Sequence, residues 1–258
     1  MSSKLLEIFD LECGYDNFSL SGINLTVQKG GFIGIIGPNG SGKTTMLKAV
    51  AGILKIKSGK IIFDDEDLIN IKRTKLAKKI AVVSQTEEHI PITVEEYVLL
   101  GRTPHFRRFQ FFETKNDLAA VHSALRGTHT EHIKGKSLLE ISSGERQLAS
   151  IAAALAQEPL LLLLDEPTSH LDIGNQVKIL NLLKRLHKEK GFTVIVILHD
   201  LNLASQYCDR LVLLNKGKAH SQGLPGQVIT KAIIEDVYQT NVEIGNHPSS
   251  NTPYVFLA

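Results

Sequence analysis

The chain has 258 residues, 43% of them hydrophobic and 22% charged, enough for one large domain or for a core with a smaller lobe. Its net charge of +2 gives no support to nucleic-acid binding, and its two cysteines, Cys13 and Cys208, lack metal-ligand spacing and fit a reducing compartment. The N-terminal residues do not read as a signal peptide, and the longest apolar run, residues 160–164, is too short to span a bilayer. If the protein works at a membrane, we expect another chain to supply the spanning helices.

Short apolar segments alternate with helical ones along the chain. Alternating apolar and polar residues predict half-buried strands near the N-terminus, and compact apolar runs predict buried strands further on. The expected strands are 5–15, 18–30, 31–37, 59–68, 78–85, 160–167, 192–200 and 210–218, and the expected helices are 43–54, 176–190 and 201–208, with a mostly helical stretch from 93 to 158 and a weak signal for a last hairpin in 242–258. This order predicts an α/β fold in which helices cover both faces of a parallel sheet, with a helical lobe inserted between residues 85 and 160.

Residues 37–44, GPNGSGKT, match the phosphate-binding pattern G-x-x-x-x-G-K-[ST], and they lie between a buried strand and a helix as the pattern requires. Glycines let the loop turn its backbone N–H groups toward phosphate oxygens. We expect Lys43 to reach the β- and γ-phosphates, Thr44 to bind Mg²⁺ and Thr45 to lie nearer the α-phosphate. A Gly-rich turn with a chance lysine is the weaker alternative in this context. The predicted nucleotide-binding loop comprises Gly37, Pro38, Asn39, Gly40, Ser41, Gly42, Lys43, Thr44 and Thr45.

Two carboxylates follow the Leu-rich run of residues 160–164. Ligands gather at the carboxyl ends of strands in such sheets, so Asp165 is placed to hold Mg²⁺ through water. Glu166, the next residue, is expected to accept a proton from an attacking water. A solvent-exposed acidic strand end is the alternative, and the phosphate-binding loop in the same chain argues against it.

Two more polar residues end apolar runs that we expect to be strands. Gln85 is expected to coordinate Mg²⁺ or to orient a water, and His199 to hydrogen-bond an oxygen of the γ-phosphate. Each alone would read as the start of a loop, but both belong to the sheet that carries the phosphate-binding loop. His129 and His132 have metal-like spacing without a third ligand, so we expect them at the surface.

Residues 140–157 place a polar Ser-Ser-Gly directly before an apolar helix. The first turn of a helix presents unpaired N–H groups and a partial positive charge, which suit an anion. Ser142, Ser143 and Gly144 would therefore face an anion, although a simple helix cap is the ordinary explanation for such a sequence.

The motifs together identify a family. Residues 215–218, NKGK, resemble the guanine-reading N-K-x-D but carry Lys218 where Asp is required, so guanine selection is not expected. Residues 141–147, ISSGERQ, resemble the signature sequence of ATP-binding cassette (ABC) proteins, L-S-G-G-Q or L-S-G-G-E. The family's order of motifs also fits over nearly the whole chain: Tyr15, the loop 37–44, Gln85, the signature, 160–166, the SHLD of 169–172, and His199.

The resemblance implies one cassette domain over residues 1–258. Its fold is a P-loop NTPase core with a mainly parallel sheet and an antiparallel β subdomain, residues 1–86 and 158–240, a helical signature subdomain, 87–157, and a C-terminal tail, 241–258. In the family two cassettes pack head to tail, and the signature of one chain caps the ATP of the other. The expected anion at the signature is thus the γ-phosphate of an ATP held by the partner chain.

Further roles follow from the same resemblance. Tyr15 would stack on the adenine of ATP, with Phe18 as an alternative platform, and Asp172 would lie at the contact between the two cassettes. Because an aromatic face reads no hydrogen bonds, we expect only modest discrimination between ATP and GTP. Ser143 departs from the usual glycine at the third signature position, which puts close backbone approach there in doubt. The implied ligands are ATP and Mg²⁺.

Residues 93–105, TVEEYVLLGRTPH, and 247–257, HPSSNTPYVFL, look like segments of importers for iron–siderophore, haem and cobalamin complexes. This resemblance implies a peripheral subunit on the cytoplasmic face of the cell membrane, working as a homodimer with integral membrane permease subunits and, indirectly, a substrate-binding protein, without nucleic acid. By residue type, the basic and aromatic segment that follows could bind nucleic acid, form a docking groove or lie near lipid headgroups, and the resemblance implies docking on the permease. Its residues are Arg102, His105, Phe106, Arg107, Arg108, Phe109, Phe111 and Phe112. The alternatives are a soluble ABC ATPase of iron–sulfur cluster assembly and a nucleotide-binding module without catalysis.

Overall fold

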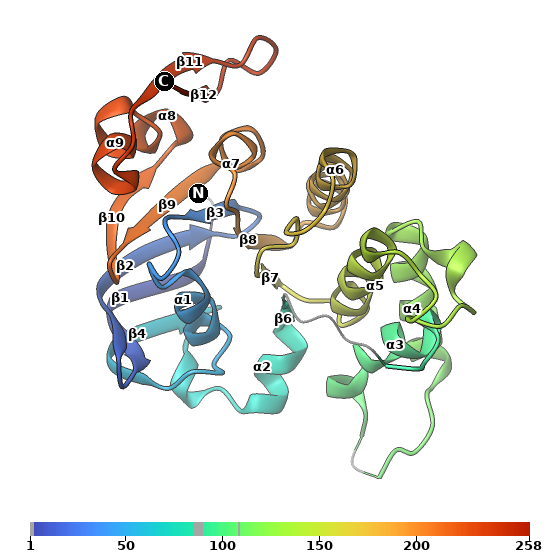
Figure 1. Cartoon of the computed structure of the whole chain (residues 1–258). Helices are drawn as coiled ribbons and strands as arrows, with labels where there is room; N and C mark the ends of the chain where they lie inside the picture. Colours follow the sequence, from blue (N-terminus) through green and yellow to red (C-terminus); the bar gives the residue numbers. More distant parts are fainter. Residues whose placement is uncertain (1–2, 85–89, 108) are drawn as a thin grey trace. The chain divides into compact units, whose positions relative to one another are not determined.

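The computed structural model describes residues 3–84, 90–107 and 109–258, which fall into two compact units (Figure 1). The first unit comprises Met1–Ile71, Leu164–Glu166 and Thr193–Ala258, and the second comprises Lys72–Leu163 and Pro167–Phe192. The second unit is larger than the expected helical insert of 87–157, because helix α2 (Arg73–Lys79), strand β6 (Ile80–Val83) and helix α6 (Ile173–Lys190) group with it.

An antiparallel sheet in the order β2-β1-β4-β5 forms one part of the first unit. Its strands are β1 (Lys4–Tyr15), β2 (Phe18–Gln28), β4 (Ile56–Phe63) and β5 (Glu66–Asp67). In β2 the apolar residues Leu20, Ile23, Leu25 and Val27 are buried while their neighbours face outward, as the alternating sequence predicts. A short 3₁₀ turn, η1 (Leu68–Asn70), follows β5.

The second sheet of the first unit has the order β10-β9-β3-β8, with β3 (Phe32–Ile36) at its centre. Strands β8 (Thr193–Ile197) and β9 (Arg210–Asn215) run parallel to β3, and β10 (Lys218–Gly223) runs antiparallel to β9. Every residue of β3 and β8 is buried, which explains their unbroken apolar sequence. The predicted mixed α/β architecture is confirmed.

Five helical or hairpin elements complete the first unit. Residues 215–218 form the tight turn between β9 and β10, with Lys216 and Gly217 at positive φ, so NKGK has a structural explanation. The weakly signalled C-terminal hairpin is also present, with five paired residues in each strand. The elements are α1 (Lys43–Val50), α7 (Leu201–Tyr207), α8 (Pro225–Val228), α9 (Lys231–Tyr238), and the hairpin of β11 (Val242–Asn246) and β12 (Pro253–Leu257).

The second unit is mainly helical, with α5 packed against both α3 and α4 (Figure 1). Its core consists of small and branched side chains, among them Val98, Val121, Leu125, Ala149 and Ile151. The second unit also contains strands β6 and β7, which are neighbours in one sheet. Its remaining elements are α3 (Val94–Leu100), η2 (Thr103–His105), α4 (Lys115–Gly127), η3 (Glu131–Ile133), α5 (Ser143–Ala156) and β7 (Leu161–Leu164), whose last residue belongs to the first unit.

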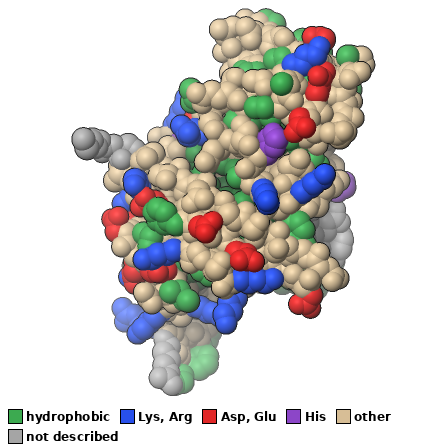
Figure 2. Space-filling model, turned by 90° about the vertical axis from the view of Figure 1, so that its left-hand side faces the viewer, with side chains coloured by type: hydrophobic (Ala, Val, Ile, Leu, Met, Phe, Trp, Pro, Cys, Tyr) green, Lys and Arg blue, Asp and Glu red, His purple; other side chains and the backbone are tan. Residues whose placement is uncertain are grey.

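Surface character agrees with the nearly balanced charge of the chain. On the face shown in Figure 2, basic and acidic side chains are interspersed and hydrophobic side chains form small separate groups. Within the described ranges, no helix is both long enough and apolar enough to cross a membrane.

Candidate functional site

The predicted phosphate-binding loop joins the buried strand β3 to helix α1, and two of its glycines are required by close contacts. Gly37 has a φ of 143°, and a Cβ there would lie 2.2 Å from the carbonyl oxygen of Leu214. Gly42 has a φ of 104°, and a Cβ there would lie 2.5 Å from Leu20 Cδ2 and 2.9 Å from Phe18 Cζ. The loop therefore packs against strands on both sides, and only glycine fits at these two positions.

Two polar side chains of this loop are suited to phosphate. Ser41 Oγ is buried and has no hydrogen-bond partner among the described residues, which is a costly arrangement for a hydroxyl. Lys43 Nζ donates to the carbonyl oxygens of Gly37 (2.9 Å) and Pro38 (3.0 Å), so its ammonium lies across the loop. Burial lowers the pKa of Lys43, and the nearby carboxylates of Glu166 and Asp165 act in the opposite direction. An unpaired hydroxyl and a buried cation on one loop fit a polyphosphate.

Thr44 and Asp165, the two residues predicted to hold magnesium, are distant in sequence but lie side by side in the structure. Thr44 Oγ1 donates to Asp165 Oδ1 at 3.1 Å. Burial raises the pKa of Asp165, the hydrogen bond from Thr44 lowers it, and the neighbouring Glu166 raises it further. Hydroxyl and carboxylate oxygens are the ligands that Mg²⁺ prefers, so this pair fits the metal. Elsewhere in the described part of the chain, no three His, Cys, Asp or Glu side chains form a metal-binding group, and His129 and His132 are both exposed.

Glu166 and His199 form a second pair at the same strand ends. His199 Nε2 contacts Glu166 Oε1 closely, with His199 the more exposed of the two side chains. The contact of His199 with a γ-phosphate oxygen stays a prediction, and in the structure its imidazole lies against Glu166, the predicted base. Glu166 itself has a φ of 53°, in the left-handed region that residues other than glycine seldom adopt.

The proposed adenine platforms lie on the hairpin between β1 and β2, where Tyr15 and Phe18 pair directly. Tyr15 is 50% exposed and offers a free aromatic face. Phe18 is partly buried and lies against Gly42 at the start of α1. Of the two predicted platforms, Tyr15 is the more accessible, and Phe18 supports the loop.

Sequence reasoning missed Tyr238, the last residue of α9. Burial raises the pKa of Tyr238 to about 12, and a hydrogen bond with the Gly37 backbone acts in the opposite direction. The hydroxyl therefore supports the first residue of the phosphate-binding loop. No local pattern marks Tyr238, since 201 positions separate it from Gly37 and only the fold joins them.

The predicted signature forms the N-terminus of α5, as expected, and it is capped. Ser142 Oγ accepts the Glu145 N–H at 3.3 Å, while Glu145 Oε2 accepts from the Ser142 N–H (2.9 Å) and Oγ–H (2.7 Å). The hydrogen bonds from Ser142 lower the pKa of Glu145. Ser142 and Ser143 are exposed, so the first turn of the helix faces outward. Its own carboxylate, Glu145, supplies negative charge there.

Asp172 caps α6, and its partner Asn175 links this helix to the signature. Asp172 accepts from the Asn175 backbone N–H at 2.9 Å and from Asn175 Nδ2 at 2.6 Å, and these hydrogen bonds together lower the pKa of Asp172. Gly144 is buried, and a Cβ there would lie 3.3 to 3.4 Å from the Asn175 side chain. Asn175 is a second residue that sequence reasoning missed. Its role as a bridge between two helix starts is visible only in the fold.

Two of the predicted residues lie outside the described residues, namely Gln85 and Arg108. The rest of the predicted docking segment is described. Phe109, Phe111 and Phe112 are highly exposed, whereas Phe106 is partly buried and Arg102 is buried within the helical unit. Arg102 is therefore part of the interior of the helical unit and does not form part of a surface for docking.

Comparisons with known proteins agree with this geometry. The family model described as "ABC transporter" matches residues 20–169. The Petrobactin import ATP-binding protein FpuC of Bacillus anthracis is 38% identical over 89% of this chain and 84% of its own length. The Ferric enterobactin transport ATP-binding protein FepC of Escherichia coli is 38% identical over 95% and 91%. A transporter assigned to the metal-chelate ABC type, solved in an inward-facing conformation, superposes with a TM-score of 0.87 at 27% identity over 99% of this chain and 98% of its own. The chain therefore belongs to the ABC transporter family, as one of its ATP-hydrolysing cassettes.

Proposed function

We propose that this chain powers a membrane importer for an iron–siderophore complex, with haem and cobalamin as the related cargo classes. The observation that carries the proposal is the likeness to FpuC and FepC, which extends over 89% and 95% of this chain. A soluble role in iron–sulfur cluster assembly has no comparable support.

The proposed chemistry is in-line transfer of the γ-phosphoryl group of ATP to water. Mg²⁺, held by Thr44 and Asp165 with Gln85 as a further candidate, would neutralise charge on the phosphate oxygens. Lys43 and the backbone N–H groups of the loop would bind the β- and γ-phosphates, and the Ser41 hydroxyl would gain the partner that it lacks. Tyr15 would hold the adenine.

Glu166 is proposed as the proton acceptor for the attacking water. Its contact with His199 orients the carboxylate, so His199 is a positioning residue in the state described. The proton leaves the water as the new P–O bond forms, and it passes to Glu166 while ADP departs with the electron pair of the broken bond.

The signature is proposed to act on the ATP of a second copy. Its exposed helix start suits a γ-phosphate, and Glu145 occupies that start in the single chain. Phosphate binding would have to compete with this carboxylate, so dimerisation and displacement of Glu145 are expected to be linked. Asp172 would then hold the Asn175 side chain, which lies next to Gly144 and would stabilise the signature.

Reconstitution tests the proposal. The chain, co-expressed with the integral membrane proteins that co-purify with it, should give ATP-dependent uptake of a ferric siderophore into proteoliposomes, and Lys43→Ala should abolish both ATPase activity and uptake. A chain that hydrolyses ATP but neither binds a multi-span protein nor drives uptake of an iron complex, haem or cobalamin would contradict the importer assignment.

A further inference from the structure

Residues 106–113, here called the aromatic loop, join η2 to α4 in the helical unit. Three of its side chains are strongly exposed: Phe109 (77%), Phe111 (83%) and Phe112 (81%). In Figure 1 the loop extends away from the helices α3 and α4 of its own unit. Exposed apolar side chains concentrated in four consecutive positions are unusual on a soluble surface and indicate an interaction site.

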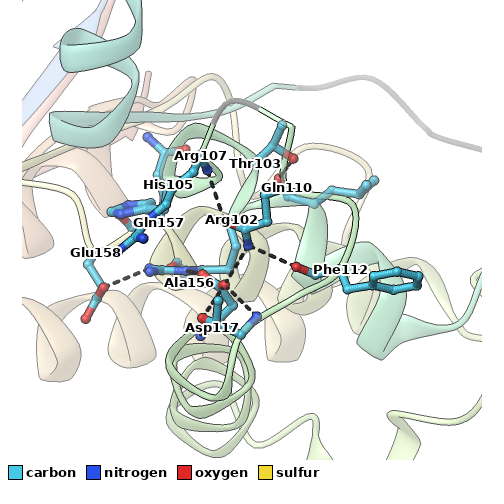
Figure 3. Close-up of polar contacts among 12 residues, drawn as sticks. Arg102, Thr103, His105, Arg107, Gln110, Phe112, Asp117, Ala156, Gln157 and Glu158 are labelled. Atoms are coloured by element: carbon cyan, nitrogen blue, oxygen red, sulfur yellow. Dashed lines mark hydrogen bonds and ion pairs between the residues drawn. The ribbon is translucent and has the colours of Figure 1, made fainter.

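The loop is held at its base by buried polar contacts, shown in Figure 3. Arg102, whose side chain is only 6% exposed, donates through Nε to Asp117 Oδ1 at 3.1 Å and through Nη1 to the Ala156 carbonyl oxygen at 2.6 Å. Gln110 fastens the loop from within, since its Oε1 accepts the Arg107 N–H at 3.0 Å and its Nε2 donates to the Phe112 carbonyl oxygen at 3.0 Å. The aromatic side chains therefore lie on a loop that hydrogen bonds from the Gln110 side chain hold in place.

The geometry of the aromatic loop favours a lipid bilayer over a groove on a protein as its partner. Phe111 and Phe112 are neighbours in the chain, and both are more than 80% exposed, so the loop presents apolar surface on more than one side. Phe109 adds a third at a backbone φ of 67°. A groove on a protein covers one side of a loop, whereas the interfacial region of a bilayer surrounds whatever enters it. Aromatic rings are also well suited to that region.

Charge points to an anionic surface. By sequence, residues 106–115 contain Arg107, Arg108 and Lys115 against the single acid Glu113, a formal charge of +2. The side chains of Arg107 and Lys115 are exposed beside the phenylalanines. Basic residues next to an apolar tip are attracted to anionic lipid headgroups, and each contributes while the tip is within a Debye length of the surface.

We propose that the aromatic loop inserts into the interfacial region of an anionic lipid bilayer, with Phe109, Phe111 and Phe112 in contact with lipid and the exposed side chains of Arg107 and Lys115 at the headgroups. This inference goes beyond the proposed import function, because it concerns the lipid rather than the permease and does not depend on the cargo.

The chain contains no tryptophan, which allows a direct test. The full-length Phe111→Trp variant carries one fluorophore in the loop, and Phe256→Trp carries one at a 50% exposed site of the C-terminal hairpin as a matched control. Each is titrated with vesicles of phosphatidylcholine containing about one third phosphatidylglycerol. We expect a blue shift and quenching by brominated lipid for the loop reporter only, weakened in high salt and in vesicles without phosphatidylglycerol.

A second pair of variants measures the contribution of the phenylalanines. The double variant Phe111→Ser with Phe112→Ser should lower the apparent affinity for these vesicles in sedimentation by about tenfold or more. Ile69→Ser, at a 74% exposed apolar site in η1, should leave it unchanged. The proposal is wrong if the loop reporter does not respond to vesicles at saturating lipid, or if the double variant sediments like the unaltered chain. It is also wrong if the reporter shifts only with a permease held in amphipol, because the loop would then be a protein contact.

Discussion

Asp117 lies under the aromatic loop, and its replacement by Asn should destabilise the helical unit by an amount that depends on pH. Asp117 Oδ2 accepts from the Thr114 N–H (2.9 Å) and Oγ1 (2.6 Å), while Oδ1 accepts from Arg102 Nε. Burial disfavours the charged carboxyl, but the hydrogen bonds from Thr114 and Arg102 outweigh it and lower the pKa of Asp117 to about 2. Asn at this position must point an N–H₂ group at one of these donors, and it removes the buried one of the two carboxylates that pair with Arg102, the other being the exposed Glu158 at 2.7 Å.

The magnitude follows from the pKa. A fall from the ordinary aspartate pKa of 3.8 to about 2 corresponds to about 2 kcal/mol of stability at roughly 1.4 kcal/mol per pH unit. Because the folded-state pKa is depressed, this contribution is complete above the unfolded-state pKa and is lost as pH falls toward the folded-state value. At pH 6 the free energy of unfolding of the parent chain should therefore exceed that of Asp117→Asn by about 2 kcal/mol or more. At pH 3 the contribution from the pKa shift should be roughly half as large, and the difference should shrink accordingly.

Urea denaturation followed by far-ultraviolet circular dichroism measures this difference. Glu113→Gln, which removes an exposed carboxylate from the same segment, is the matched control and should be nearly neutral at both pH values. A difference for Asp117→Asn below about 0.5 kcal/mol at pH 6, or one that does not change between pH 6 and pH 3, would refute the assignment of Asp117 as the buried anion of this network.

Four further predictions concern the nucleotide site. Glu166→Gln keeps shape but removes the proton acceptor, so phosphate release should fall about 10²- to 10⁴-fold, and size-exclusion chromatography should show a dimer with ATP but not with ADP; full activity would remove Glu166 from this role. Asp165→Asn should weaken magnesium-dependent ATP binding and hydrolysis together, and a normal affinity in a binding titration would count against it. Gly37→Ala would bring a Cβ to 2.2 Å from the Leu214 oxygen, so fluorescent-nucleotide binding should be lost, and retained binding would contradict the close approach. Tyr15→Ala should weaken the binding of ATP and of GTP to a similar extent in a competition assay. A strong preference of the parent chain for GTP would contradict the role of Tyr15 as an aromatic platform that does not distinguish the two bases.

The sequence predicted most strands and the phosphate-binding loop because their signals are local. The five buried residues of β3 are consecutive, and the glycines that follow lie at fixed spacings. Helix α2, rich in lysine, was not predicted, since Leu76 is its one buried residue and gives no periodicity. Tyr238 and Asn175 were missed for a different reason. Each acts through a contact with a residue distant in sequence, and one sequence carries no record of such contacts.

The separate tasks proposed for Asp165 and Glu166 rest on the backbone between them. Asp165 follows the buried strand β7 and reaches Thr44 Oγ1 at 3.1 Å. At Glu166 the backbone enters the left-handed region, with a φ of 53°, at a cost of about 1–2 kcal/mol for a residue with a Cβ. After this turn the Glu166 carboxylate contacts His199. The letters D and E side by side predict two acids at a strand end, but only the strained turn separates one that contacts Thr44 from one that contacts His199. Because surrounding structure must hold such a turn, we infer that the contact with His199 helps to stabilise it.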